Sequence, residues 1–476
     1  MVESVWSMSC EIAPRQSLCG HIRSEVAVIG AGMAGILIAH TLREAGYEVV
    51  VLERDRIALG QTRGTTAKLT AQHGMIYQKL ARTLGAERAR QYAMANEAAL
   101  RAYRELIAAR EIDCDFEDCD AYVYGGDEAA LRAEAETAAE LGLPADYVRD
   151  TPLPFPTAGA VRFAGQARFH PLKLLKAVSE DLTVYERTPV LTVEDDRAVT
   201  ESGSVRAEHI VFACHYPFVN IPGLYFVRMH QERSYVLALE NAPEIPGMWI
   251  GAEQYSWSFR RHNGLLLFGG AGHRTGDNKA GGRYDLLREK AREWFPDSRE
   301  AAHWSAQDCM TPDSVPYIGR YAASRPNWYV ATGFGKWGMT SSMAAALLLR
   351  DLIRGEESPY AAVFDPRRFG LTNAVGVAVQ SGHAVKGLAK QLFQVPSEKA
   401  SQLSAGHGGI VFLNGKKAGA SRDADGKLRR VDVRCPHMGC QLEWNPDEQS
   451  WDCPCHGSRF DCSGELLSGP AQRPAK

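Results

Sequence analysis

Long apolar runs, an excess of basic charge and evenly spread cysteines are all missing from this chain of 476 residues. The longest candidate apolar run, around residues 343–349, is far shorter than the roughly 18 residues of a membrane-spanning helix. Residues 1–24 contain no unbroken apolar run of the kind found in secretory signals. With 54 lysines and arginines against 57 aspartates and glutamates, the net charge of −3 argues against a nucleic-acid partner. We therefore expect a cytoplasmic protein with no membrane span.

The cysteines are concentrated at one end, because five of the 11 lie within residues 435–476. A disulfide framework would be dispersed along the chain, whereas a local metal or redox site produces a cluster. The length predicts two to four domains of roughly 100–200 residues each. An apolar content of 45% and a charged content of 23% are typical of folded globular proteins.

A glycine-rich turn lies between two short β-branched segments near the N-terminus. In chain order there are a strand at 25–29, a G-x-G-x-x-G motif at 30–35, a helix at about 34–45, a second strand at 48–52 and an acidic residue, Glu53. In such a motif Gly30 makes the tight turn, Gly32 lets backbone N–H groups approach a pyrophosphate, and Gly35 lets helix and strand pack closely. The helix N-terminus stabilises the phosphates, and Glu53 accepts hydrogen bonds from a ribose. The unit predicts FAD or NAD binding; the alternative is a glycine-rich turn without a ligand.

The residues that follow resemble one family of flavoproteins. Residues 59–74, L-G-Q-T-R-G-T-T-A-K-L-T-A-Q-H-G, are similar to the FAD-contacting segment of the D-amino-acid-oxidase superfamily. Four more segments resemble it in the expected order: Q-A-R-F-H-P at 166–171, I-V-F-A-C-H-Y-P at 210–217, T-P-D-S-V-P-Y-I-G at 311–319 and G-F-G-K-W-G-M-T at 333–340. The resemblance implies FAD rather than NAD. It implies cofactor contacts at Gly30, Gly32, Ala34, Gly35, Glu53, Arg54, Thr66, Ala67, Val190, Gly333, Gly335, Trp337, Gly338 and Met339.

The same resemblance implies an α/β FAD-binding (Rossmann-like) domain with an inserted α+β substrate domain, together residues 24–370. The expected nucleotide-binding pieces are about 24–75, 160–217 and 311–356, and the substrate-domain pieces are about 76–159 and 218–310. Helical periodicity predicts helices at 86–110 and 128–141, and alternation predicts strands within 231–270. An adapter helix and linker at 371–403 would lead to an all-β module at 404–476, with the adapter helix at 371–393 and a polar linker at 397–409.

The residue just before the T-P-D segment bears on the class of substrate. In α-amino-acid oxidases of the superfamily an arginine before the T-P-D segment binds the substrate carboxylate, and this chain has Asp308 there. That difference favours a cationic or neutral amine, unless Asp308 only bonds to backbone or faces solvent. Arg260 is a second candidate contact, the alternative being a solvated hairpin tip. Lys336 would lie close to the flavin by family position and is a third candidate, with no specific chemistry assigned to it.

Two short boxes, C-P-H-M-G-C at 435–440 and C-P-C-H-G-S at 453–458, each offer one cysteine and one histidine. A Rieske [2Fe–2S] cluster needs two thiolates on one iron and two imidazoles on the other. The predicted ligands are Cys435, His437, Cys453 and His456. Zinc is the alternative, but a zinc finger usually has both cysteines in one pair and both histidines in the other.

The boxes also resemble those of respiratory Rieske proteins. That resemblance implies a disulfide between Cys440 and Cys455 and a hydroxyl donor to the cluster at Ser458. The respiratory proteins have tyrosine where this chain has Phe460, which implies a lower reduction potential.

The whole chain resembles flavin oxidoreductases of the D-amino-acid-oxidase superfamily that carry a C-terminal Rieske domain. The resemblance implies a dehydrogenase that oxidises a small amine-type substrate by hydride transfer to FAD and passes single electrons through the cluster to an unidentified external acceptor. Two alternatives remain: reverse flow, with an outside donor feeding the cluster and the flavin reducing a substrate, or a non-enzymatic redox sensor or electron-transfer adaptor. A Rieske oxygenase is disfavoured, because the 2-His-1-carboxylate iron site it needs is not evident.

Overall fold

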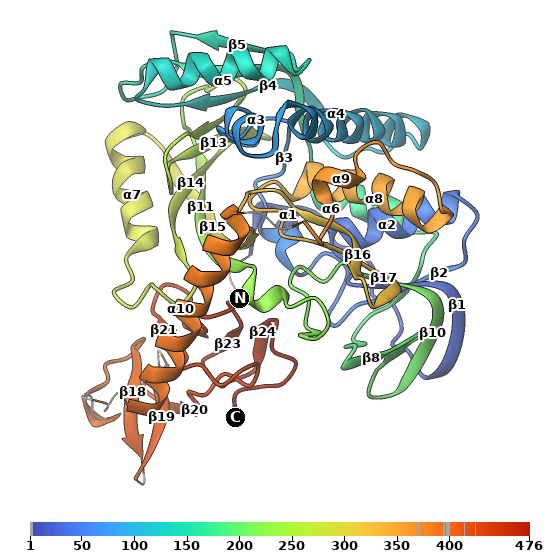
Figure 1. The fold of residues 1–476 in the computed structure, drawn as a ribbon. Coiled ribbons are helices and arrows are strands. Elements are labelled where there is room, and N and C mark those ends of the chain that lie inside the picture. Colours follow the sequence, from blue (N-terminus) through green and yellow to red (C-terminus); the bar gives the residue numbers. More distant parts are fainter. Residues whose placement is uncertain (1–2, 369–370, 394–395, 397–399, 414, 424) are drawn as a thin grey trace.

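The computed structural model describes residues 3–368, 371–393, 396, 400–413, 415–423 and 425–476. An α/β body extends from the N-terminus to α9 (Ala361–Phe364), and a β-rich module occupies the C-terminal end. Figure 1 shows the module, orange to red, below the body, with α10 (Leu371–Phe393) running between them. The expected fold class is confirmed: an α/β body followed by an all-β C-terminal part.

A largely parallel sheet forms the first half of the body, in the order β16-β17-β10-β1-β2-β7. Its strands are β1 (Gly20–Ile29), β2 (Val49–Leu52), β7 (Thr183–Tyr185), β10 (Gly203–Phe212), β16 (Tyr317–Ala322) and β17 (Arg325–Thr332), with β8 (Thr192–Glu194) and β9 (Arg197–Val199) as a side hairpin. Because β2 is buried throughout, it is the continuous apolar run V-V-V-L expected of a central parallel strand. The helices packed with this sheet are α2 (Met33–Glu44) and α8 (Gly338–Arg354), and α6 (Pro171–Ser179) packs against α2.

A second, mixed sheet carries the substrate half, in the order β15-β11-β14-β13-β12-β4-β6-β3, with β5 beside β6. Its strands are β3 (Lys68–Leu69), β4 (Glu117–Tyr124), β5 (Ala145–Val148), β6 (Ala160–Arg168), β11 (His230–Glu240), β12 (Met248–Gly251), β13 (Ser258–His262), β14 (Leu265–Arg274) and β15 (Arg299–Met310). The attached helices are α3 (Tyr77–Leu84), α4 (Ala86–Ala109), α5 (Glu128–Glu140) and α7 (Arg283–Trp294). The helices predicted at 86–110 and 128–141 are confirmed as α4 and α5.

The module contains a three-stranded and a four-stranded sheet. Their strands are β18 (Gly408–Leu413), β19 (Lys416–Arg422), β20 (Leu428–Val431), β21 (Glu443–Asn445), β22 (Ser450–Asp452), β23 (Arg459–Asp461) and β24 (Leu466–Ser468). Trp451, Phe460 and Leu442 are fully buried in its own hydrophobic core, which also holds the cysteines of both boxes. The module therefore has a core separate from that of the body.

Helix α10 is continuous despite its internal glycines. Two of these glycines allow the helix to pack closely against its neighbours. A Cβ on Gly376 would lie 2.5 Å from Pro312 of the body, and one on Gly387 would lie 2.5 Å from the Cys455 sulfur. Part of the predicted linker, residues 397–399, lies outside the described residues; η3 (Ala400–Gln402) follows. Among the helices described, none is long and apolar enough to cross a membrane.

The N-terminal residues, to which the sequence analysis assigns no element, form α1 (Val5–Ser9). Trp6 is fully buried, and its indole N–H donates to the Thr65 carbonyl oxygen at 2.7 Å. Burying a large aromatic stabilises a fold by about 1.5–3 kcal/mol. Trp6 thus holds the chain end against the segment that precedes β3. Two short 3₁₀ turns, η1 (Gln61–Gly64) and η2 (Tyr225–Val227), complete the elements.

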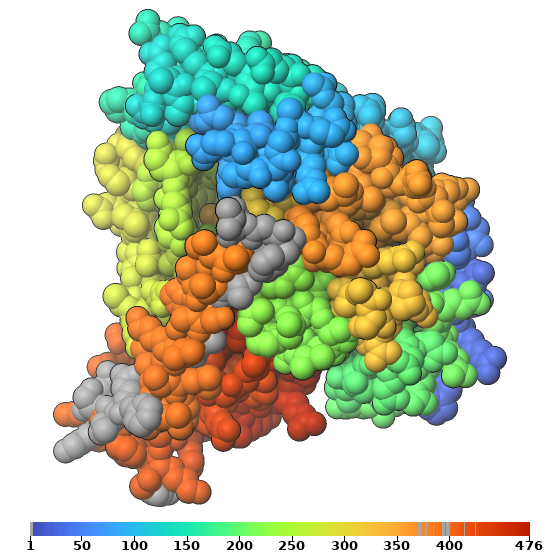
Figure 2. Space-filling model, viewed as in Figure 1, coloured from blue at the N-terminus to red at the C-terminus, as the bar shows by residue number. Residues whose placement is uncertain are grey.

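The module is docked on the body through a buried ionic network. Arg233 on β11 pairs with Glu448 of the module at 2.7 Å, with side-chain exposures of 2% and 12%. Glu448 also accepts hydrogen bonds from Ser305 and Tyr284 of the body. Burial raises the pKa of Glu448, but Arg233 and Arg459 outweigh it and lower this pKa to about 2. In Figure 2 the red surface of the module lies directly against the body.

Candidate functional site

One cavity of the body lies where the glycine turn, the end of β2, β15 and the start of α8 meet. Most residues expected from the sequence to touch FAD line it. These are Gly30, Gly32, Ala34, Glu53, Arg54, Val190, Gly333, Gly335, Gly338 and Met339, together with the substrate candidates Asp308 and Lys336. The cavity therefore runs from the predicted nucleotide cradle to the predicted substrate end.

The three motif glycines differ in what surrounds them. Gly30 has φ +107°, and a Cβ there would lie 2.6 Å from the Ala213 carbonyl oxygen. A Cβ on Gly35 would lie 1.8 Å from the Gly30 carbonyl oxygen, so only glycine permits this approach of helix and turn. A Cβ on Gly32 would meet only the Thr62 hydroxyl, at 3.3 Å, and would otherwise project into the cavity. Gly32, the N-cap of α2, thus leaves the open side that a pyrophosphate needs.

Glu53 lines the cavity directly after β2. Its carboxylate accepts hydrogen bonds from the backbone N–H groups of Ala31 (2.7 Å) and Asp55 (2.9 Å). Burial raises its pKa, which the two N–H groups partly offset. Each carboxylate oxygen retains acceptor capacity, so Glu53 fits the ribose-binding role.

Four predicted cofactor contacts do not line the cavity: Gly35, Thr66, Ala67 and Trp337. Gly35 instead packs helix against turn. Trp337 stacks on His73 with ring centres 4.9 Å apart, and neither ring lines the cavity.

Arg260 requires a correction. It is 1% exposed, and its guanidinium donates to the carbonyl oxygens of Thr66, Ala67 and Phe169. It is therefore neither a solvated hairpin tip nor a lining residue of the cavity. Burial lowers its pKa to about 9, and its contacts make it a structural residue that fixes the loop before β3.

Asp308 and Lys336 line the cavity, and Glu232, which is not among its lining residues, lies beside them. Asp308 on β15 lies opposite Glu232 on β11, and Lys336 Nζ lies 3.6 Å from the Glu232 carboxylate. Burial raises the pKa of Asp308 to about 7, with Lys336 lowering it and Glu232 raising it. Burial also opposes ionisation of Glu232, but His230 and Lys336 hold its pKa below the usual value. A carboxyl that titrates near neutrality is suited to proton transfer.

Several lining residues were missed by the sequence analysis. They are Pro189, His215 and Gln307 of the body and Leu467, Ser468, Gly469 and Gln472 of the module. His215 lies inside the segment 210–217 and Pro189 is next to Val190, so the sequence alone could have suggested both as cofactor contacts. The module residues could not be predicted, because the sequence does not reveal how two domains dock.

The two boxes fold into matching turns that bring the predicted cluster ligands together. The Gly439 N–H donates to the Cys435 carbonyl at 2.8 Å, and the Gly457 N–H donates to the Cys453 carbonyl at 2.9 Å. Both glycines have φ near +80°, at 81° and 79°. The sulfurs of Cys435 and Cys453 are within hydrogen-bonding distance of each other.

The histidines complete this arrangement. Nδ1 of His437 and Nδ1 of His456 face each other at 3.2 Å. Burial lowers the pKa of His437 to about 4 and that of His456 to about 3, so both imidazoles are neutral, as metal binding requires. His437 Nε2 lies 3.0 Å from Asn220 Oδ1 of the body, an outer contact of the kind that orients ligand histidines. Two buried thiols and two inward Nδ1 atoms therefore fit a Rieske cluster.

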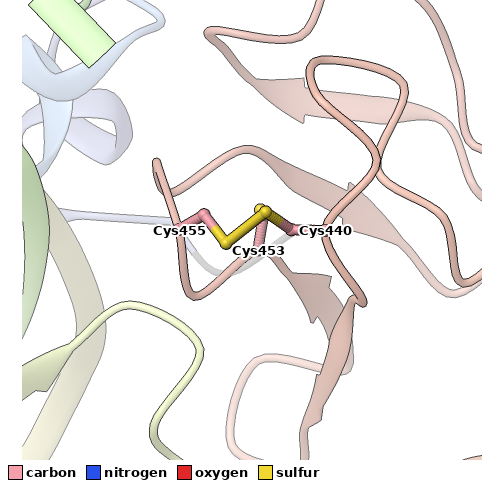
Figure 3. A group of neighbouring side chains, drawn as sticks. All are labelled: Cys440, Cys453 and Cys455. Atoms are coloured by element: carbon pink, nitrogen blue, oxygen red, sulfur yellow. A yellow bond between two sulfur atoms is a disulfide. The ribbon is translucent and has the colours of Figure 1, made fainter. Parts of the chain in front are cut away.

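A disulfide joins the loops beside these residues. Cys440 and Cys455 are bonded to each other, with Cys453 next to them, as Figure 3 shows. The three sulfur atoms lie within 4.8 Å of one another. Because two of them form the disulfide, this trio does not compete with the thiol and imidazole set as a metal site. Ser458 hydrogen-bonds the Cys435 sulfur and accepts from the Ala471 N–H at 3.0 Å.

Cavity and cluster loops together define a flavoenzyme with an iron–sulfur domain, and comparison with known proteins supports this. The FAD dependent oxidoreductase model (DAO) matches residues 25–352, and the Rieske [2Fe-2S] domain model matches residues 393–476. The chain therefore belongs to the FAD-dependent oxidoreductase family and carries a Rieske domain. It is an oxidoreductase whose cofactors are FAD and a [2Fe–2S] cluster.

Three similar proteins illustrate the match. The putative Rieske 2Fe-2S iron-sulfur protein YhfW of Bacillus subtilis is 39% identical, over 100% of this chain and 97% of the relative. The gamma-glutamylputrescine oxidoreductase of Escherichia coli is 24% identical, over 74% of this chain and 88% of the relative. Glycine oxidase from Geobacillus kaustophilus has a similar fold, with a TM-score of 0.61 and 20% identity over 73% of this chain and all of that structure.

Proposed function

We propose that the protein is a dehydrogenase that oxidises a small amine-type substrate by hydride transfer to FAD and passes the electrons singly through the Rieske cluster to an external acceptor. The observation that supports this best is a shared wall. Leu467, Ser468 and Gly469 of the module line the same cavity as Gly32 and Glu53. A cluster domain placed there is suited to exchange electrons with a bound flavin.

The glycine turn and Glu53 would bind the cofactor. The N-terminus of α2 at Gly32 would hold the pyrophosphate, and Glu53 the ribose. FAD, when bound, supplies the hydride acceptor. On the cluster side, Cys435 and Cys453 would hold one iron, and His437 and His456 the other.

The charges at the flavin end favour an amine. An alkylamine is protonated at neutral pH and must lose that proton before its carbon can give up a hydride. Asp308, with a pKa of about 7, would accept the proton, and Glu232 would attract the cation. Two of the similar proteins are named for glycine and gamma-glutamylputrescine, both of which contain amino groups.

Anaerobic titration with a panel of primary, secondary and tertiary amines tests the proposal. Absorbance reports flavin bleaching, and electron-spin resonance reports cluster reduction. We expect at least one amine to reduce both centres in the wild type, and only the flavin in Cys453→Ser. If no amine bleaches the flavin while an external one-electron donor reduces cluster and then flavin, electron flow runs the other way.

A further inference from the structure

Two buried amide side chains link the flavin cavity to the second cluster loop. Gln231 on β11 is 1% exposed and Gln307 on β15 is 0% exposed. Gln307 Nε2 donates to Gln231 Oε1, so the two amides form one hydrogen-bonded pair. Gln307 is held by two neighbours of the body: its backbone N–H donates to the Gln61 amide oxygen at 2.7 Å, and Arg233 donates to its side-chain amide oxygen at 3.1 Å.

One end of this pair reaches the backbone of the loop that carries His456. Gln231 Nε2 donates to the His456 carbonyl at 2.6 Å, and Gln307 Nε2 donates to the Gly457 carbonyl at 2.8 Å. A Cβ on Gly457 would lie 2.7 Å from Gln231. The loop therefore needs glycine there, both for its left-handed φ and for this close approach.

The other end of the pair reaches the flavin cavity. Gln307 itself lines the cavity, as does His215. His215 Nε2 donates to Gln231 Oε1 at 3.2 Å. Burial lowers the pKa of His215 to about 4, so its ring is neutral at physiological pH and adds no charge to the route.

Other contacts between body and module do not make this connection. Asn220 touches His437 but does not line the cavity. Arg274 donates to the carbonyls of Pro454 and Cys455 and is likewise absent from the cavity wall. Hydrogen bonds join body and module at several places among the described residues. Of these, only the glutamine pair both lines the cavity, through Gln307, and bonds the backbone of a proposed cluster ligand or of the residue next to it.

We propose that Gln231 and Gln307 couple the flavin cavity to the cluster electronically, so that electrons enter through the second ligand loop. The inference rests on the relay in the proposed function. One electron leaves reduced FAD and converts one ferric ion of the cluster to ferrous; the amides exchange no atoms and keep their protons. Electron tunnelling weakens steeply across empty gaps, and a continuous hydrogen-bonded path shortens them. The two glutamines are thus positioning residues.

The double variant Gln231→Leu/Gln307→Leu in the full-length holoenzyme tests the route, because leucine fills similar space without hydrogen bonds and both branches to the loop are lost. A flash-generated deazariboflavin radical injects one electron per molecule, and absorbance follows its first-order redistribution between FAD and cluster. We expect this rate to fall about ten- to a hundredfold, the range by which losing an outer-shell hydrogen bond lowers metal affinity or activity. Each single leucine variant removes one branch, so its rate should change in the same direction by a smaller factor. Asn278→Ala is the matched control, since Asn278 bonds Asn445 and Asp447 across the same interface but off the route.

The reduction potential and spin-resonance spectrum of the cluster show whether a slower electron transfer reflects weaker electronic coupling or a changed cluster potential. Both should stay unchanged in the double variant, because the amides contact backbone carbonyls and not the proposed ligand atoms. An unchanged rate in the double variant overturns the route, as does a rate change fully explained by a shifted potential. If the wild type itself shows no redistribution, the relay in the proposed function fails instead.

Discussion

The two redox centres are built in opposite ways. The cluster site draws all its proposed ligands from two boxes within residues 435–458, and each box is one glycine turn. The flavin cavity draws its wall from the β1–α2 turn, β2, β15, the start of α8 and the module itself. A compact site of this kind depends on local turns, whereas a dispersed one depends on packing between distant segments. A substitution at one centre should therefore leave the other intact, unless the substituted residue is one of the module residues that line the cavity.

The largest effect is expected from removing a cluster ligand. Cys453→Ser should abolish the Rieske spin-resonance signal while stoichiometric FAD remains, because module and body have separate cores. Cys462→Ser is the control, since Cys462 is a free cysteine of the module outside both boxes. Metal and flavin analysis of the purified proteins checks both. Equal loss of FAD and iron from Cys453→Ser would show that the two centres are not independent.

The complementary change is at the glycine turn. Gly32→Val should yield folded protein that keeps its cluster but lacks FAD, because the side chain fills the pyrophosphate cradle. Gly35→Ala should instead destabilise the fold by about 1–3 kcal/mol or more, because its Cβ has no room beside the Gly30 carbonyl. Flavin absorbance and denaturant unfolding of the FAD-free proteins measure the two effects. FAD bound normally by Gly32→Val would contradict the cradle assignment.

A smaller effect is expected at Asp308. As a proton acceptor it works when ionised, so flavin reduction by an amine should speed up as pH rises through about 7 and then level off. Asp308→Asn should remove this inflection and slow reduction by about 10²- to 10⁴-fold. Lys336→Met should move the inflection to higher pH, because Lys336 lowers the Asp308 pKa. Stopped-flow absorbance across pH 5–9 records the profile; an inflection that survives in Asp308→Asn would assign it to another group.

The smallest effect is expected inside the module. Phe460 is fully buried in the core that also holds the cluster cysteines. In Phe460→Tyr the new hydroxyl would donate to a cluster ligand sulfur and favour the reduced state. A bond of about 1 kcal/mol would raise the one-electron potential by roughly 40 mV. Voltammetry of the full-length protein measures it, and an unchanged or lower potential with the cluster intact would show that Phe460 only packs.

The same contrast explains what the sequence could predict. The glycine motif and the cluster boxes were readable because each function is carried by residues close together in the chain. Arg260 was misread, since three backbone carbonyls from two other segments surround it only after folding. Gln231 and Gln307 carry no sequence signal, because their partners lie in a separately folded domain. Trp6 was missed because a five-residue helix, α1, shows no periodicity.

The central claim, that electrons from the flavin leave through the cluster, is tested most directly by steady-state reduction of cytochrome c. This acceptor is too large to enter the flavin cavity, and the amine that bleaches the flavin best would serve as the reductant. We predict that the wild type reduces cytochrome c, whereas Cys453→Ser bleaches its flavin at the same rate but reduces no cytochrome c. Equal cytochrome c reduction by both proteins would contradict the account.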